Sequence, residues 1–425
     1  MRFKTLPEWL AWQENLHFTE VDPGLSRIGL VWNQLRKEKT VLPFTVITVA
    51  GTNGKGSSVA MLESILRAAG YRTGTYTSPH LLRYNERICI NSIPCDDTSI
   101  CQAFERIDNA RQTTSLTYFE FATLAAIDIF CQQKIDIAIL EVGMGGRLDA
   151  VNLFDTDIAL ITPIGLDHVN WLGSTRELIG REKAGIIRAN KPVVCSESEP
   201  PQSLLAYAQS LSAPVYKAQT DYHFSVSDIN WQWSRSGQRW QDLPFPALAG
   251  SYQFNNAAAV LKVIDILIKQ GKDISKQAIA RGLSGVKLAG RFQQISGPVE
   301  RIFDVTHNQQ GAENLAKLLA EKPCDGKTYA VLAMLKDKDV AAVVDVLKSS
   351  IDVWYLAGLS GSRGMTADEM ANKISHLIKP AKCVNSAEVI DAYHLAMENA
   401  KNGDRVLIFG SFHTVEAVMK TILND

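Results

Sequence analysis

The chain has 425 residues, of which 46% are hydrophobic and 21% charged, and its formal net charge is −1 at pH 7. This composition is typical of a folded protein with two or three domains, and it excludes a disordered chain or a polybasic one that binds nucleic acid nonspecifically. Its apolar stretches fall short of the ~18 residues that a membrane helix needs, so we expect neither export nor a membrane span.

The first two thirds of the chain alternate short apolar segments with longer helical patterns. Apolar segments lie at 44–49, 135–142 and 157–163, and a helical pattern lies at 57–69. Such alternation predicts an α/β domain with a largely parallel sheet. An alternating segment at 223–240 indicates a β-hairpin that decorates the edge of this domain, before a helical pattern at 256–270.

A second α/β domain is predicted to begin near residue 297. The segment LAGRFQQISGP at 288–298 is rich in turn-forming residues, and the alternation of strands and helices restarts at 299–304, 329–334, 353–357 and 406–409. We therefore predict two α/β domains. Residues 1–296 form a P-loop domain with a mainly parallel sheet and a small β decoration, and residues 297–425 form a Rossmann-like domain.

The segment TVITVAGTNGKGSSVAMLESILRAAG at 45–70 reads as a strand, a glycine-rich turn and a helix. Backbone amides at a helix start and a lysine between glycines are typical of a phosphate site. The spacing departs from GxxxxGK[ST], since Val49 replaces the first glycine and Gly56 displaces Ser57 by one position. A turn that binds nothing is the alternative, but it leaves Lys55 without a purpose. The nucleotide-binding residues predicted here are Thr52, Asn53, Gly54, Lys55, Gly56 and Ser57.

Further motifs accompany the variant loop GTNGKGS. They are TSPHLLRYNERI at 77–88, LTYFEF at 116–121, LEVGMGGRLDAVN at 140–152, LDHVNWLG at 166–173, REKAGI at 181–186, GRFQ at 290–293, FDVTHN at 303–308 and GSFHTV at 410–415. In this order they resemble the folylpolyglutamate synthases, and more closely the bifunctional dihydrofolate synthase/folylpolyglutamate synthases, which are relatives of the Mur ligases. The resemblance covers nearly the whole chain. It implies an ATP-dependent acid–amino-acid ligase that joins glutamate to dihydropteroate and adds γ-linked glutamates to reduced folates, through an acyl phosphate.

Glu141 ends an apolar strand, at the sheet edge where carboxylates commonly meet ligands. The resemblance implies that Ser78, Glu141, His168 and a carbamylated Lys183 bind two Mg²⁺ ions. Magnesium prefers oxygen ligands, so a hydrogen-bonded loop histidine is the alternative for His168. Taken alone, Lys183 would be a solvated helix lysine.

The resemblance also assigns ATP contacts to Asn256, Arg291 and Asp304, which places the nucleotide between the domains. The alternatives are a helix N-cap for Asn256 and a surface salt bridge for Arg291 and Asp304. His307 is expected to face the nucleotide or the incoming amino acid. Lys55, Lys183 and His307 are therefore the predicted catalytic residues, while His413 stays unassigned.

Three segments match those that contact the pterin-bearing substrate in the family. The predicted substrate residues are Asp22, Pro23, Gly24, Thr117, Tyr118, Phe119, Glu120, Leu148, Asp149 and Ala150. Aromatic faces suit a flat heterocycle, although Tyr118 and Phe119 could equally be core residues. Pro23 replaces a leucine of close relatives, which leaves folylpolyglutamate synthase activity alone as an alternative.

Two rival functions remain. A Mur-type peptidoglycan ligase is disfavoured by the LTYFEF segment and by the lack of an added N-terminal UDP-binding domain, and a nucleotide-dependent switch would bind ATP without ligation. Seven scattered cysteines lack the CxxC pairs of a zinc site and indicate reduced thiols. We expect a cytoplasmic monomer that uses ATP, Mg²⁺, dihydropteroate, reduced folates and L-glutamate, and that binds neither nucleic acid nor membrane.

Overall fold

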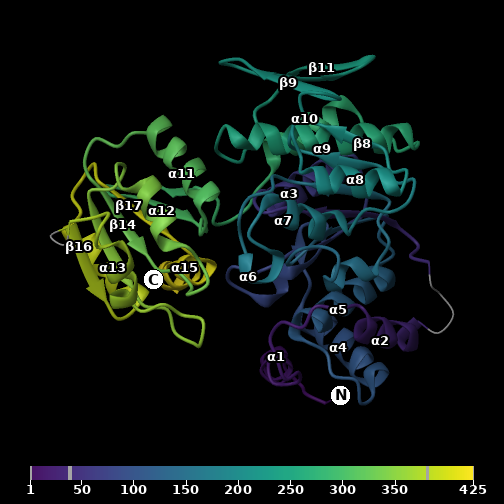
Figure 1. Ribbon diagram of the computed structural model, residues 1–425, viewed down its shortest axis with the longest axis horizontal. Helices are drawn as coiled ribbons and strands as arrows, with labels where there is room; N and C mark the ends of the chain where they lie inside the picture. The colour runs from purple at the N-terminus through teal and green to yellow at the C-terminus, as the bar shows by residue number, and fades with distance from the viewer. Residues whose placement is uncertain (1, 37–40, 380–381, 425) are drawn as a thin grey trace.

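An eight-stranded sheet forms the centre of the N-terminal domain in the computed structural model, which describes residues 2–36, 41–379 and 382–424 (Figure 1). The strand order is β4-β3-β2-β5-β1-β6-β7-β8, and the run from β2 to β8 is parallel. The strands are β1 (Thr45–Ala50), β2 (Thr73–Tyr76), β3 (Ile88–Ile90), β4 (Ile93–Pro94), β5 (Ile137–Glu141), β6 (Ile158–Ile161), β7 (Val193–Cys195) and β8 (Val215–Lys217). The prediction of a mainly parallel sheet is confirmed.

Helices cover both faces of this sheet because its central strands are apolar on both sides. In β1, Val46 and Ala50 belong to one core, whereas Ile47 and Val49 belong to the other. The first core lies under α1 (Leu6–Gln13), α2 (Ser26–Arg36), α4 (Asp97–Arg111), α5 (Tyr118–Gln133), α7 (Arg176–Ala184) and α8 (Gln202–Ser210). The second lies under α3 (Lys55–Ala68), α9 (Tyr252–Lys269) and α10 (Lys276–Gly285). Three short elements, η1 (Tyr84–Arg87), η2 (Ala150–Leu153) and α6 (Val169–Leu172), lie in the connecting loops.

The β decoration is a separate antiparallel sheet of β9 (Tyr222–Val226), β10 (Trp231–Arg235) and β11 (Gln238–Leu243). The expected β decoration of the first domain is present, but it has three strands instead of the two of a hairpin. Trp231 and Trp233 point to the same face and are fully buried, and the Trp233 indole Nε1 donates to the carbonyl of Ala258 in α9 at 3.0 Å. The small sheet therefore covers α9 instead of extending the large sheet (Figure 1).

The C-terminal domain is built on a six-stranded sheet of order β12-β13-β17-β14-β15-β16, in which only β12 is antiparallel to its neighbour. Its strands are β12 (Gln293–Ile295), β13 (Glu300–Asp304), β14 (Thr328–Leu332), β15 (Val353–Ala357), β16 (Cys383–Ser386) and β17 (Arg405–Phe409). One face packs on α11 (Gln309–Glu321), α12 (Val340–Leu347) and α13 (Ala367–Ile374), and the other on α14 (Val389–Asn399) and α15 (Phe412–Asn424). Because β12 precedes residue 297, the sheet starts slightly before the predicted boundary, which itself stays a prediction.

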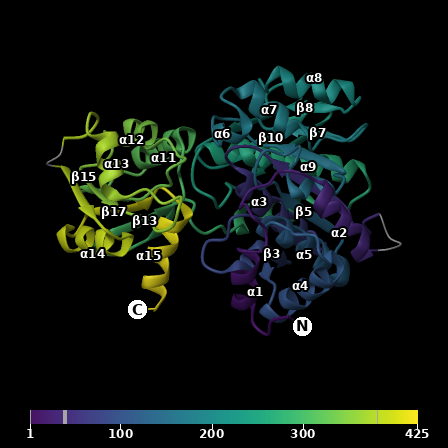
Figure 2. The ribbon, with the colours of Figure 1, turned by 60° about the horizontal axis from the view of Figure 1, so that its bottom comes forward.

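The two domains lie side by side, and α6 of the N-terminal domain lies on the side that faces the C-terminal domain (Figures 1 and 2). Parallel strands in both domains end in loops, and such carboxyl edges are where ligands bind in open α/β sheets. None of the helices in the described part of the chain is long and apolar enough for a membrane span.

Candidate active site

The glycine-rich loop after β1 leads directly into α3, which begins at Lys55. Gly54 caps this helix with a positive φ of 89°, and a Cβ at Gly54 would lie 2.7 Å from Oδ1 of Asn256. A Cβ at Gly51 would collide with the side chain of Thr162. The Nζ atom of Lys55 donates to the carbonyls of Gly51 at 3.2 Å and Thr52 at 3.1 Å. The loop thus folds tightly around a lysine at a helix N-terminus, an arrangement suited to anions.

A cavity lies above this loop and is walled by both domains; we call it the loop cavity. Thirteen predicted residues line it, namely Thr52, Asn53, Gly54, Lys55, Gly56, Ser57, Ser78, Glu141, His168, Lys183, Arg291, Asp304 and His307. Asn256 is absent from the described lining, and its buried Nδ2 donates to Oε1 of Gln253 at 3.0 Å. The N-cap of α9 is Ser251, so the interpretation of Asn256 as an N-cap was wrong. Asn256 instead packs behind Gly54.

Ser78, Glu141 and His168 bring a hydroxyl, a carboxylate and an imidazole to one wall of the loop cavity. Burial raises the pKa of Glu141, and the charge of Lys55 opposes that rise. Burial lowers the pKa of His168 to about 4, so its ring is neutral near pH 7 and keeps a lone pair for a cation. The described residues contain no cluster of three or more His, Cys, Asp or Glu side chains that would hold a metal alone. A hydroxyl, a carboxylate and phosphate oxygens nevertheless suit magnesium, which takes few protein ligands.

Lys183 is buried, with 4% of its surface exposed, and its Nζ atom donates to the carbonyl of Gly51 at 2.7 Å. It is therefore not a solvated helix lysine. Burial, followed by the charge of Lys55, lowers the pKa of Lys183 to about 7. A large fraction of this amine is neutral at physiological pH, and only a neutral amine is nucleophilic.

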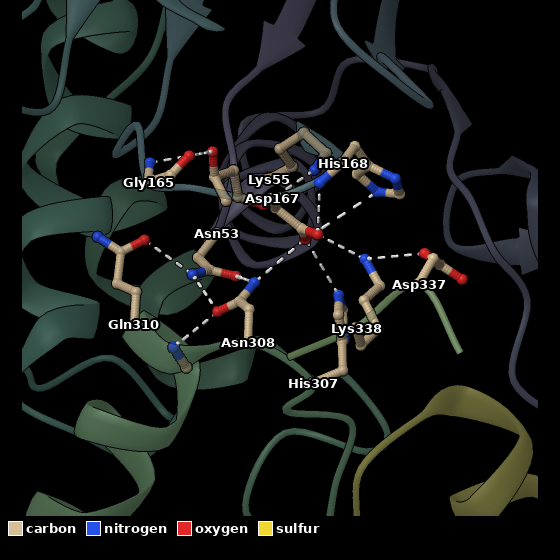
Figure 3. Close-up of polar contacts among 12 residues, drawn as sticks. Asn53, Lys55, Gly165, Asp167, His168, His307, Asn308, Gln310, Asp337 and Lys338 are labelled. Atoms are coloured by element: carbon tan, nitrogen blue, oxygen red, sulfur yellow. Dashed lines mark hydrogen bonds and ion pairs between the residues drawn. The ribbon is translucent and has the colours of Figure 1, made fainter. Parts of the chain in front are cut away.

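Asp167 is the centre of a polar network that joins the two domains (Figure 3). Its carboxylate lies 2.5 Å from Nζ of Lys338 and 3.5 Å from Nε2 of His307, and it accepts a 3.3 Å hydrogen bond from Nδ2 of Asn308. Burial alone would raise the pKa of Asp167, but the His307 hydrogen bond and the Lys338 charge hold it well below its usual range. Asn308 and Asn53 also exchange side-chain hydrogen bonds of 3.0 and 3.1 Å across the domains.

Sequence reasoning missed Asp167 and Lys338 as site residues. Asp167 precedes the predicted ligand His168 within LDHVNWLG, and Lys338 lies in a charged run, LKDKD, that follows β14. Polar residues after a buried parallel strand are the signal that could have identified them. His413 lines neither cavity in the described structure; its side chain is 63% exposed and lies 3.6 Å from Glu416.

Arg291, just before β12, and Asp304, at the end of β13, line the side of the loop cavity formed by the sheet of the C-terminal domain. The Arg291 guanidinium lies over the ring of Phe412, 5.3 Å from its centroid. Asp304 is buried and accepts backbone hydrogen bonds of 2.8 Å from Phe292 and Thr306. Among the described residues, neither side chain has a partner for the surface salt bridge that was the alternative for this pair.

A second cavity of about 790 Å³, the substrate cavity, adjoins the first. All ten predicted substrate residues line it: Asp22, Pro23, Gly24, Thr117, Tyr118, Phe119, Glu120, Leu148, Asp149 and Ala150. Thr117 and Glu120 also cap α5 reciprocally, through hydrogen bonds of 2.8 and 3.2 Å. Tyr118 and Phe119 are half-buried and pack against the core as well as facing the cavity. Their packing on the core is therefore confirmed, while their contact with a substrate stays a prediction.

The two cavities share one wall. In the described part of the chain, seven residues line both of them: Ser78, Pro79, Gly143, Met144, Gly145, His168 and Leu172. Gly143 is required here, since a Cβ would lie 2.7 Å from the Phe119 ring. A ligand in the substrate cavity and an anion held by the loop can therefore meet at this wall, beside the candidate metal ligands.

Comparison with known proteins identifies both halves of the chain. The Mur ligase middle domain matches residues 49–264, and the Mur ligase glutamate ligase domain matches residues 290–412. The dihydrofolate synthase/folylpolyglutamate synthase of Escherichia coli (strain K12) is 43% identical over 417 residues, which cover 98% of this chain and 95% of the relative.

Solved structures agree with these matches. E. coli FolC in complex with DHPP and ADP has a TM-score of 0.92 at 42% identity, covering 99% of this chain and 98% of that one. A bifunctional folylpolyglutamate synthase/dihydrofolate synthase with Mn, AMPPNP and L-glutamate bound has a TM-score of 0.90 at 41% identity, with the same coverage.

Proposed function

The chain belongs to the Mur ligase family, among the dihydrofolate synthase/folylpolyglutamate synthases, and from this membership we propose which substrate of an ATP-dependent ligase each of its two cavities binds. The substrate cavity holds dihydropteroate or a reduced folate, and the loop cavity holds ATP. The observation that supports this proposal is the shared wall of seven described residues. At this wall the acid of one ligand would reach the terminal phosphate of the other.

In the first stage the carboxylate is activated. A carboxylate resists attack by an amine because it is negatively charged and would have to expel oxide; transfer of the γ-phosphoryl group removes both obstacles. Lys55 and the amides of the loop stabilise the charge on the transferring group, so positioning and electrostatics supply most of the acceleration. Ser78, Glu141 and His168 would hold magnesium, which when bound neutralises phosphate oxygens.

We assign Lys183 a modified side chain. Its burial and its lowered pKa of about 7 support carbamylation, since a neutral amine adds to carbon dioxide and releases one proton to give a carbamate. The resulting anion would suit a second magnesium ion, which an ammonium group would repel. Density that extends beyond Nζ in a crystal of the metal-loaded protein would support this assignment, and plain lysine density would contradict it.

In the second stage the amino group of glutamate attacks the acyl phosphate and phosphate leaves. Lys338 brings a positive charge and His307 an imidazole from the C-terminal domain to the network of Asp167, beside the shared wall. Contacts between the domains would exclude water, which would otherwise hydrolyse the activated acid.

The proposed enzyme acts as a monomer in the cytoplasm. Residues of both domains line the two cavities, and no disulfide joins the cysteines in the described structure. Light scattering on the purified protein checks its oligomeric state.

One assay tests the proposed function. Purified protein with magnesium, ATP and glutamate is supplied with either dihydropteroate or tetrahydrofolate, and ADP release and the glutamylated product are measured. Turnover of both acids is expected. Turnover of tetrahydrofolate alone would leave folylpolyglutamate synthase activity only, whereas ATP binding without glutamate-dependent turnover would refute the ligase.

A further inference from the structure

Two loops of the C-terminal domain, each with a cationic side chain, complete the substrate cavity. The domain contributes four residues to the described lining, and all are polar: Lys336, Asp337, Ser362 and Arg363. The loops follow β14 and β15, and the amide of Lys336 donates to the carbonyl of Arg363 at 2.9 Å. This hydrogen bond, with the bridge between Leu335 and Gly364, holds two cationic side chains at one edge of the cavity.

Arg363 already contacts carboxylates from both domains. Its NH1 atom lies 3.1 Å from Oε1 of Glu20 in the N-terminal domain, and its NH2 atom lies 3.2 Å from Oδ1 of Asp337. The Arg363 side chain is 44% exposed and that of Glu20 is 68% exposed. An ion pair this exposed contributes little stability, so another carboxylate can replace Glu20 on the guanidinium. The contact with Glu20 therefore shows where a carboxylate can bind to the guanidinium of Arg363.

The rest of the cavity suits the other end of a folate. Tyr118 and Phe119 offer aromatic faces to a flat heterocycle, and both come from the N-terminal domain. A cavity of about 790 Å³ lies in the upper part of the range of roughly 300–1,000 Å³ for small-molecule sites. It has room for a substrate longer than a pterin and its benzoate.

We propose that Arg363, with Lys336 beside it, binds the α-carboxylates of the glutamyl tail and so distinguishes folates from dihydropteroate. This inference rests on the proposed function. Dihydropteroate ends in the benzoate carboxylate that is activated and carries no α-carboxylate, whereas each glutamate of a folate tail adds one. Arginine suits this role because its planar guanidinium forms paired hydrogen bonds with a carboxylate.

The test compares Arg363→Gln, Arg363→Lys and a control, Arg239→Gln, with the wild type. Arg239 is an exposed arginine of β11 and lines neither cavity in the described structure. KM and kcat are measured for dihydropteroate, tetrahydrofolate monoglutamate and tetrahydrofolate diglutamate, with saturating ATP, magnesium and glutamate. Thermal denaturation verifies that each variant is folded.

Arg363→Gln is expected to raise KM for the two glutamylated folates by roughly tenfold and for dihydropteroate by less than about twofold, because one charge-assisted contact is lost. For the glutamylated folates, the KM values of Arg363→Lys should lie between those of Arg363→Gln and the wild type. The KM values of Arg239→Gln should match those of the wild type. An equal rise in KM for all three acids would overturn the proposal, as would unchanged KM values for the two glutamylated folates. A wild-type protein that turns over none of the acids would instead refute the proposed function itself.

Discussion

The Nζ atom of Lys338 lies 2.5 Å from Oδ1 of Asp167, and this ion pair joins the C-terminal domain to the loop that carries His168. Both side chains are largely buried, at 7% and 10% exposure. A buried pair loses far more when one partner is removed than an exposed pair does, because a charge remains without compensation. The pair is therefore one of the contacts that hold the two domains together.

Asp167→Asn should weaken the contact between the domains by about 3–5 kcal/mol, since it leaves Lys338 buried and unpaired. We expect a larger radius of gyration in small-angle X-ray scattering and a higher KM for glutamate. Asp345→Asn is the matched control, because Asp345 lies at the same 2.5 Å from Lys348 but 55% exposed. An unchanged radius of gyration in Asp167→Asn would contradict this role.

Lys55→Ala should keep the fold yet lower ADP formation by about 10²–10³-fold or more, because a positive charge aimed at the transferring phosphate is removed. Steady-state kinetics measures the loss, and circular dichroism checks the fold. Lys276→Ala, an exposed lysine at the start of α10, should be neutral. Near-normal turnover of Lys55→Ala would refute its assignment.

Removal of divalent metal with a chelator should abolish turnover, and magnesium should restore it. Glu141→Gln should raise the magnesium concentration that gives half-maximal activity, by about 10–100-fold, because the amide is a weaker ligand than the carboxylate. Excess magnesium should rescue this variant only in part. A magnesium titration identical to that of the wild type would exclude Glu141 as a ligand.

Activity should rise as the pH rises through about 7, because burial and Lys55 lower the pKa of Lys183 to about 7 and carbamylation needs the neutral amine. Below that pH the ammonium form predominates, so added bicarbonate should raise activity most between about pH 6 and 7. Lys183→Arg stays cationic and should lose both the activity and the carbamate signal in ¹³C NMR with labelled bicarbonate. If added bicarbonate leaves the pH profile of the wild type unchanged, this result would count against carbamylation of Lys183.

Gly282→Ala should destabilise the N-terminal domain by about 1–3 kcal/mol, because the added methyl group would overlap the backbone of Ile65 where α10 packs on α3. Gly285→Ala on the same helix is the control, since its Cβ would only approach Ser64 Oγ at 4.0 Å. Urea denaturation gives the free energy of unfolding for both. Equal free energies of unfolding for the two variants would show that α10 can shift away from α3 without a loss of stability.

The sequence predicted the elements that depend on residues close together in the chain. The unit β1–loop–α3 is read from one continuous segment, and each predicted strand of both sheets matches an observed strand within a few residues. The Asp167 network could not be read in this way, because its partner Lys338 lies 171 residues away. The residues that the family resemblance grouped line the two cavities, except for Asn256, but their individual roles stay predictions.

Two misjudged details have physical causes. Asn256 before a run of alanines looks like a helix start, yet α9 already begins at Tyr252, and Asn256 lies buried in its first part. The alternating segment after Tyr222 shows two strands clearly, but only packing of Trp231 and Trp233 on α9 decides where the sheet lies.

The wall of seven residues between the cavities has a consequence for inhibitor design. Ligands that meet at one wall can be fused by a very short tether, so a pteroate-like acid joined through a phosphinate to a nucleotide mimic could occupy both cavities at once. Such a compound would bind more tightly because binding of one half raises the effective concentration of the other. The linker length that gives the highest affinity would indicate the distance between the two reacting groups.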